Sequence, residues 1–166
     1  IYNLVRLIGE DMKKSEFDSY NIKYFDDTSI KKVSMKYSRK NEFKYLWAYL
    51  SPQYCKRKIK IKADNTFYKE IGNYIYNYEL FLLIDKCCIE DSEEDLSILA
   101  SAKTILKILI DNYWDLDEVC ISSLDYEWII CINHNFEIFL VGNKIINYFN
   151  SVIKNERIAE CVILYE

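Results

Sequence analysis

The chain has 166 residues, 51% of them hydrophobic and 16% aromatic, with three glycines, one proline and a formal net charge of −4. This length and composition predict a single packed domain over residues 1–166, and they exclude a disordered chain and a disulfide-stapled miniprotein. No apolar run approaches the ~20 residues that a membrane-spanning helix needs. Because the first residues also lack the pattern of a signal peptide, we expect a cytoplasmic protein without membrane contact, whose six cysteines are reduced thiols.

In the first half of the chain, the apolar spacing of residues 2–13 predicts a helix, and the polar stretch 18–27 predicts a loop. Apolar and polar residues alternate in SIKKVSMKYS (29–38) and in CKRKIKIKA (55–63), and aromatic residues recur with period two in NEFKYLWAYL (41–50). These patterns predict three strands of a meander. A short helix is the alternative for residues 41–50.

From Thr66 the apolar spacing becomes helical, and it leads into the apolar run ELFLLID (79–85), which periodicity leaves open as helix or strand. Ser92, followed by three acids, resembles a helix N-cap. The apolar stripe from Leu96 to Leu109 predicts that this helix continues to about Asn112.

Three short runs rich in β-branched and aromatic residues follow, at 117–125, 127–133 and 136–142, and they predict an antiparallel meander. Gly142 and Asn143 end this meander and begin a last helix, and AECVILYE (159–166) is a strand or a helix. The expected fold class is therefore α+β, with helices covering largely antiparallel sheet.

Charge is distributed unevenly along the chain. Residues 1–83 carry 16 Lys and Arg against 10 Asp and Glu, and residues 84–166 carry 6 against 16, so the halves are about +6 and −10. Eleven basic residues lie between Ile30 and Lys62, with Glu42 as the only acid. This Lys-rich region could bind nucleic acid, contact an acidic protein, or neutralise the acidic half of its own fold. The acidic total argues against nucleic acid, and a solvated or internally paired face is the preferred interpretation.

The single histidine, His134, lies between two asparagines in the corner between two predicted strands, where it is interpreted as a turn residue. A nucleophile–base pair would require Cys131 and His134 to face each other, although Cys131 lies within a strand. A hydrolase that uses His134 with Cys131 or Glu127 remains an alternative. No second histidine, paired-cysteine motif or glycine-rich phosphate loop accompanies them, so we expect no metal, no cofactor and no enzyme activity.

Two acidic clusters are candidate partner-binding surfaces. The first surrounds two aromatic residues at the end of the predicted 92–112 helix, where acids oppose the helix dipole; it comprises Asp111, Tyr113, Trp114, Asp115, Asp117 and Glu118. Carboxylates around an exposed aromatic residue suit a basic partner. The second cluster comprises Glu90, Asp91, Glu93 and Glu94, with Asp95. Acids in the first turn of a helix would also explain this second cluster.

The segment from Asn112 to Gly142 contains Trp128, Ile129, Ile130 and Cys131, followed by Asn133, His134 and the closing Gly142. This pattern resembles the C-terminal strands of small bacterial immunity proteins, over about 30 of the 166 residues. Asn135 stands where that pattern often has a second histidine, which argues further against a metal or a catalytic role. The resemblance implies an immunity partner of a polymorphic toxin, of the contact-dependent growth inhibition type.

Such a protein binds a toxin domain and blocks it by stoichiometric occlusion, without catalysis. Many toxins of this kind are basic nucleases, and an acidic surface would attract them. We therefore expect an immunity protein that contacts its toxin through the Asp111 to Glu118 cluster first and the 90–95 cluster second. The alternative is a nucleic-acid-binding module that uses the Lys-rich 30–62 region, with an affinity that falls steeply with salt.

Overall fold

The computed structural model describes residues 12–54, 56–61, 66–112, 115–116, 118–155, 159 and 162–165. The strands are β1 (Lys23–Phe25), β2 (Lys56–Ile61), β3 (Glu79–Ile84), β4 (Leu96–Ser101), β5 (Val119–Ser123), β6 (Ile129–Ile132), β7 (Glu137–Val141) and β8 (Val162–Tyr165). The α-helices are α2 (Thr28–Tyr37), α3 (Thr66–Ile75), α4 (Ala102–Asp111) and α5 (Asn143–Val152), and the 3-10 helices are η1 (Lys14–Ser19), η2 (Leu46–Tyr49) and η3 (Lys86–Cys88).

All eight strands form one sheet in the order β1-β4-β3-β5-β6-β7-β2-β8, and every neighbouring pair is antiparallel. The fold is thus α+β, as predicted. The meander of β5, β6 and β7 is also confirmed, and the strand interpretation holds for ELFLLI and for the end of the chain. Strand β2, from the first half of the chain, lies between β7 and β8 from the second half.

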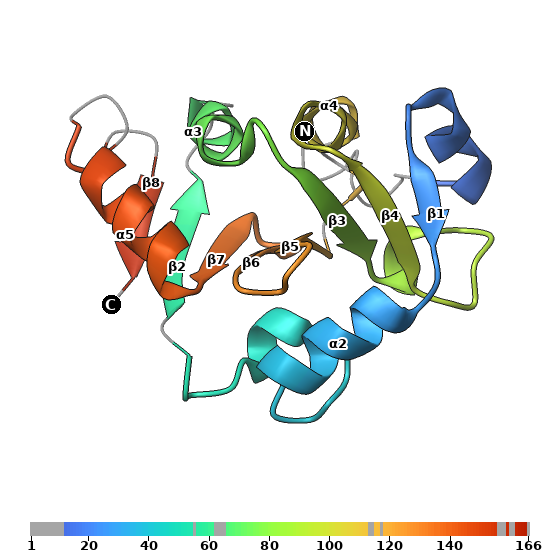
Figure 1. Cartoon of the computed structure of the whole chain (residues 1–166), viewed down its shortest axis with the longest axis horizontal. Coiled ribbons are helices and arrows are strands. Elements are labelled where there is room, and N and C mark those ends of the chain that lie inside the picture. Colours follow the sequence, from blue (N-terminus) through green and yellow to red (C-terminus); the bar gives the residue numbers. More distant parts are fainter. Residues whose placement is uncertain are drawn as a thin grey trace.

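Helices cover both faces of the sheet (Figure 1). Helices α3, α4 and α5 pack against one face, and α2 with the 43–50 segment packs against the other. The alternation along β3 explains how one strand serves two cores, since Leu80, Leu82 and Ile84 enter the first core while Phe81 and Leu83 enter the second. Buried on both faces, the central strands are apolar throughout, which is why ELFLLI shows no polar alternation.

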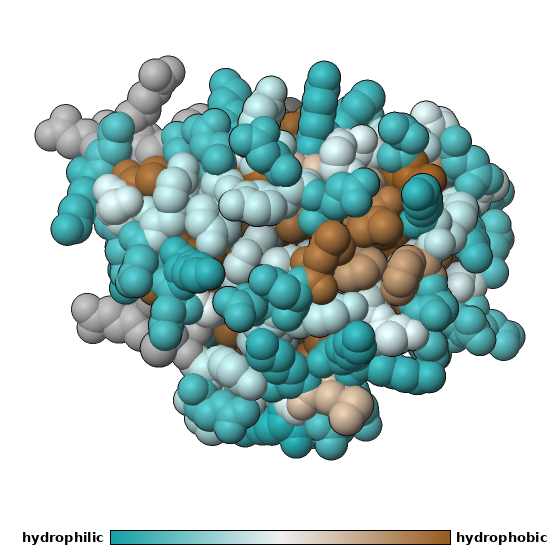
Figure 2. All heavy atoms as spheres, viewed as in Figure 1, coloured by the Kyte–Doolittle hydropathy of each residue, from teal (hydrophilic) through white to brown (hydrophobic). Residues whose placement is uncertain are grey.

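Hydrophilic side chains cover most of the view in Figure 2, and apolar side chains gather over β3 and β4. Phe25 of the edge strand β1 packs against Phe81 of β3 in this part of the sheet, with ring centroids 5.1 Å apart. Phe81 also stacks on Tyr126 at 5.8 Å. No helix among the described residues is both long enough and apolar enough to cross a membrane.

The predicted strand at 29–38 is wrong, because this segment is helix α2. The buried residues Ile30, Val33, Ser34 and Tyr37 recur with the spacing i, i+3, i+4 and i+7, which is a helical stripe. The lysines between them produced the apparent period of two. Residues 41–50 contain the 3-10 helix η2, closer to the short-helix alternative than to a strand.

The predicted helix over 92–112 is wrong in its first half, where Leu96–Ser101 forms strand β4. Ser101, not Ser92, is the N-cap of α4, and its side chain accepts a hydrogen bond from the backbone N–H of Thr104 at 3.2 Å. The predicted loop over 18–27 includes the short strand β1. The predicted N-terminal helix over 2–13 lies almost entirely outside the described residues.

Candidate functional site

Four adjacent strands bring polar residues together at one end of the sheet. The register pairs Ile84 of β3 with Leu96 of β4 and with Val119 of β5, and pairs Val119 with Ile132 of β6. The residues immediately beyond these pairs are Asp95, Asp85, Glu118 and Asn133 with His134. We call this row, which follows the strand order β4-β3-β5-β6, the sheet-end site.

A cavity of about 560 Å³ opens on the β3–β4 side of this site. Its walls come from helix α2, the loop that follows it and the segment that joins β3 to β4. Six acids and three lysines lie among its lining residues, which are Asp27, Ile30, Lys31, Ser34, Asn41, Glu42, Phe43, Lys44, Asp85, Lys86, Glu93, Glu94 and Asp95. We call it the acidic cavity. The second predicted cluster contributes Glu93, Glu94 and Asp95 to it.

Two residues that line the acidic cavity each have a buried side-chain oxygen without a hydrogen-bond partner among the described residues. Asp85 and Ser34 are each 3% exposed, and the unpartnered atoms are Oδ2 of Asp85 and Oγ of Ser34. The other oxygen of Asp85 accepts a hydrogen bond from the backbone N–H of Cys87 at 3.3 Å, so the carboxylate is held at the start of η3. A buried carboxylate oxygen without a donor is costly, and such groups call for a ligand, an ion or water.

Glu93, Glu94 and Asp95 lie in the turn before β4 and not in a helix. The hydroxyl of Ser92 donates to the carbonyl of Glu94 at 2.6 Å, and Oδ1 of Asp95 accepts from the N–H of Lys86 at 3.1 Å. Burial raises the pKa of Asp95, the hydrogen bond from Lys86 lowers it, and the nearby charge of Asp85 raises it again. Carboxylates thus crowd one another here, which favours a cationic ligand.

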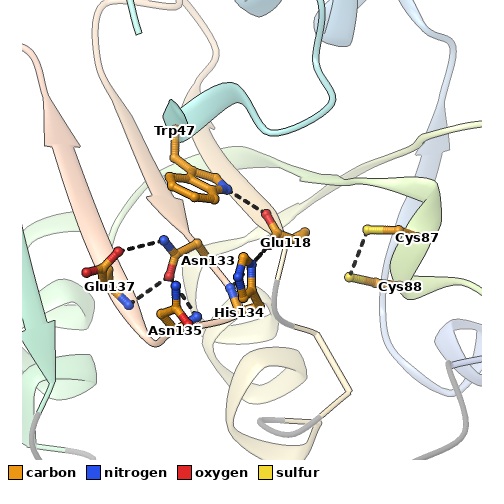
Figure 3. A network of polar contacts seen from close by, with 8 residues as sticks. All are labelled: Trp47, Cys87, Cys88, Glu118, Asn133, His134, Asn135 and Glu137. Carbon is orange, nitrogen blue, oxygen red and sulfur yellow. Dashed lines mark hydrogen bonds and ion pairs between the residues drawn. The ribbon is translucent and has the colours of Figure 1, made fainter. Parts of the chain in front are cut away.

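On the β5–β6 side, Glu118 is the centre of a network with Trp47 and His134 (Figure 3). Glu118 is 6% exposed, and its Oε2 accepts a hydrogen bond from Nε1 of Trp47 at 2.7 Å. Its Oε1 contacts Nδ1 of His134 and accepts from the His134 backbone N–H at 3.3 Å. Burial raises the pKa of Glu118, whereas the bonds from His134 and Trp47 lower it.

The corner around His134 is held by its neighbours. The buried Asn133 side chain donates to Glu137 Oε2 at 2.9 Å and accepts from the backbone N–H groups of Asn135 and Glu137. His134 is therefore a turn residue of the β6–β7 hairpin, as interpreted from the sequence. Its ring faces Glu118, while Cys131 is buried opposite Cys120 of β5 and burial raises the pKa of Cys120.

The described residues of the first predicted cluster lie in different environments. Glu118 is buried in the network above, so its carboxylate does not form the exposed surface that we expected. Asp111 is exposed and pairs with Lys107 at 2.5 Å and with the hydroxyl of Tyr20 at 3.1 Å. These contacts are consistent with its lowered pKa, for which the Lys107 bond is the main cause. Asp115 is partly exposed, and Tyr113, Trp114 and Asp117 lie outside the described residues.

Two other acids of the second cluster do not line the acidic cavity. Glu90 lies 3.8 Å from Lys13, and its backbone N–H donates to the carbonyl of Met12. Asp91 is exposed. No group of three or more His, Cys, Asp or Glu that could hold a metal ion occurs within the described ranges.

The Lys-rich 30–62 region is not a three-stranded sheet, since β2 is the one strand that the structure describes within it. Several of its lysines contact other parts of the chain. Lys58 pairs with Glu137 at 2.7 Å, Lys36 donates to the carbonyl of Tyr126 at 2.7 Å, and Lys31 pairs with Asp27 at 2.6 Å. Lys40 lies over the ring of Tyr49, 3.5 Å from its centroid. These contacts agree with an internally paired face.

Sequence reasoning missed Asp85, Ser34 and Trp47. A usable signal existed for Asp85, because it directly follows the buried strand ELFLLI. Asp95 and Glu118 likewise directly precede buried strands. Charged residues that immediately border fully apolar strands collect at the ends of a sheet. Which strand ends meet depends on the strand order, which the sequence does not reveal.

No curated protein and no solved structure is significantly similar to the chain. A match over residues 6–152 covers the sheet from β1 to β7 and both sides of the sheet-end site, and it is to a family described as a family of unknown function. The chain therefore belongs to the DUF6756 family.

Proposed function

We propose that this protein is an immunity protein that binds a basic toxin domain in the bacterial cytoplasm and blocks it stoichiometrically, without catalysis. The acidic cavity is the observation that carries this proposal. It combines the exposed carboxylates of Glu93 and Glu94 with the buried carboxylate of Asp85 in a hollow of about 560 Å³. An acidic hollow of this size suits a projecting basic segment of another protein.

We place the proposed contact at the acidic cavity and not at the first predicted cluster. Glu118 is buried and bonded, and Asp111 already has Lys107 as its partner, so neither carboxylate is poised for a new cation. Exposed carboxylates around the cavity would steer a basic toxin during encounter, and the buried carboxylate would then hold one of its cationic groups.

A nucleic-acid-binding role receives less support. The lysines of the 30–62 region that pair with Glu137, Asp27 and the Tyr126 carbonyl are engaged within the fold. A phosphate-binding surface needs cations that are available to the backbone of the nucleic acid.

The experiment is a pull-down of the tagged full chain from its native host at moderate salt, followed by mass spectrometry. The proposal expects a basic toxin domain in a 1:1 ratio, and expects that the purified chain abolishes the activity of that domain when equimolar. A variant with Glu93→Lys and Glu94→Lys should recover much less toxin. Recovery of nucleic acid alone, or toxin that remains active in the complex, would overturn the proposal.

A further inference from the structure

We infer that the acidic cavity binds a single arginine side chain presented by another protein, with the guanidinium group held by Asp85 and Ser34. This inference deepens the proposed function, on which it rests, because it names the group of the partner that the cavity takes. It starts from two buried oxygens that have no hydrogen-bond partner among the described residues, Oδ2 of Asp85 and Oγ of Ser34, and whose residues line the cavity.

No lysine or arginine among the described residues pairs with Asp85. Three lysines line the cavity, yet none of them forms an ion pair with this carboxylate in the part of the chain that the structure describes. Lys31 is paired with Asp27 at 2.6 Å, and Lys44 lies 5.3 Å from the ring centroid of Tyr45. A buried carboxylate is stable only when it is paired or well hydrogen-bonded, and the inferred arginine would supply such a partner.

The shape of the acceptor set favours a guanidinium over an ammonium group. The acceptors come from separate elements: Ser34 from α2, Asp85 from the end of β3, and Glu93 and Glu94 from the turn before β4. A guanidinium presents five N–H donors in a planar fork and can reach acceptors on several sides, whereas an ammonium group is a compact point charge.

A metal ion fits these residues less well. Within the part of the chain that the structure describes, no three carboxylate, histidine or cysteine side chains converge closely enough to ligate one. The cavity is also far larger than a metal site, and its volume of about 560 Å³ lies in the range of sites for organic groups.

In the test, the peptide acetyl-Gly-Arg-Gly-amide is titrated into the isotope-labelled full chain. Binding is measured from the changes in the amide NMR chemical shifts. Two matched peptides carry lysine or citrulline in place of arginine; citrulline keeps the shape of arginine without its charge. We expect shifts concentrated at Ser34, Asp85 and 93–95, and an affinity at least tenfold higher for arginine than for citrulline. Lysine should bind at least threefold more weakly than arginine.

Asp85→Asn should weaken arginine binding at least tenfold, and Ser34→Ala about threefold. Glu70→Gln on α3, which removes a carboxylate that does not line the cavity, should change nothing. Asp85→Asn changes a buried residue, so the amide spectrum of this variant must first show the native fold. The double variant Glu93→Gln with Glu94→Gln changes only the rim of the cavity and leaves the core intact. Equal binding of arginine and citrulline, or shifts outside the cavity, would overturn the inference.

The two proposals fail in different ways. If the Asp85→Asn variant captures and inhibits a toxin as well as the unaltered chain does, the immunity function stands and the arginine site is wrong. If the peptide binds in the cavity as expected while the native host yields no toxin, the arginine site stands and the immunity function is wrong.

Discussion

Glu118 illustrates how a single residue can be misread from its sequence neighbours. It closes the acidic stretch that begins at Asp111, yet the register of β5 places it at a buried strand end, bonded to Trp47 and His134. Trp47 lies far away in the sequence, in the 3-10 helix η2. The stability of this buried carboxylate therefore depends on donors that no local pattern reveals.

Replacing Trp47 with Phe is expected to lower the free energy of unfolding by about 2 kcal/mol at neutral pH, because a hydrogen bond to a buried charged group is lost. Burial raises the pKa of Glu118 above its ordinary value of 4.5, and the hydrogen bond from Trp47 makes this increase smaller. A raised folded-state pKa gives a stabilising contribution below the unfolded pKa, and this contribution is lost as the pH rises through the folded pKa.

Without Trp47 the pKa of Glu118 rises further, so Trp47→Phe should cost more at pH 7 than at pH 4. Urea denaturation at both pH values measures this difference. The substitution also loses packing against Phe139, whose ring lies 5.8 Å from that of Trp47. This loss is the same at both pH values, so it cancels when the two changes in unfolding free energy are compared. An equal loss at pH 7 and pH 4 would contradict the assigned role of the carboxylate.

Gly142 is a second residue whose identity the fold requires. Its φ is +116°, and a Cβ there would lie 2.9 Å from Cβ of Trp128 and 3.0 Å from the carbonyl of Glu127. Gly142→Ala should therefore lower the free energy of unfolding by about 2 kcal/mol or more. Gly72→Ala in α3 is the control, since its Cβ would meet only the flexible end of Leu106. A larger loss in Gly72→Ala, measured by the same denaturation, would contradict this assignment.

At the scale of elements, sequence patterns predicted the three-strand meander and helix α5 because each element there is short, apolar and bounded by turn residues. They failed at 29–38 and at 92–101 for one reason. Both segments are amphipathic with ambiguous period, and tertiary contacts decide between helix and strand. Leu96–Ser101 becomes a strand because it lies between β1 and β3 in the sheet. The candidate site was predicted only in part, since Glu93 and Glu94 line the acidic cavity but the buried Asp85 went unnoticed.

The N-terminus of α4 can be tested directly. If α4 begins at Ala102, Ser101→Ala removes its N-cap and should cost about 1 kcal/mol in the free energy of unfolding. If the helix began near Ser92, residue 101 would lie inside it, and alanine there would be neutral or stabilising. Lys103→Ala, at an exposed position within α4, should change stability by less than about 0.5 kcal/mol and serves as the control.

At the scale of the whole molecule, the basic and acidic halves of the chain do not form two poles. Strand β2 is paired with β7 and β8, and β1 is paired with β4, so strands from the two halves are mixed within one sheet. The ion pair between Lys58 and Glu137 joins the two halves across neighbouring strands. The uneven distribution of charge therefore persists only locally, and the acidic cavity is one place where acidic residues gather.

A local acidic site makes a specific prediction about association with the proposed toxin. Exposed charges at an interface act mainly on the association rate, and their effect is screened by salt. Glu93→Lys with Glu94→Lys should therefore slow association at least tenfold at low ionic strength, and the deficit should shrink in roughly 0.5 M salt. Stopped-flow or surface-based kinetics measures both.

Glu70→Lys with Glu79→Lys is the matched control, because it changes the net charge by the same amount at residues that do not line the acidic cavity. If steering depends on the local field of the cavity, this control should slow association much less than the variant at 93 and 94. Equal slowing by both pairs would mean that total charge governs encounter. The cavity would then have no special part in attracting its partner.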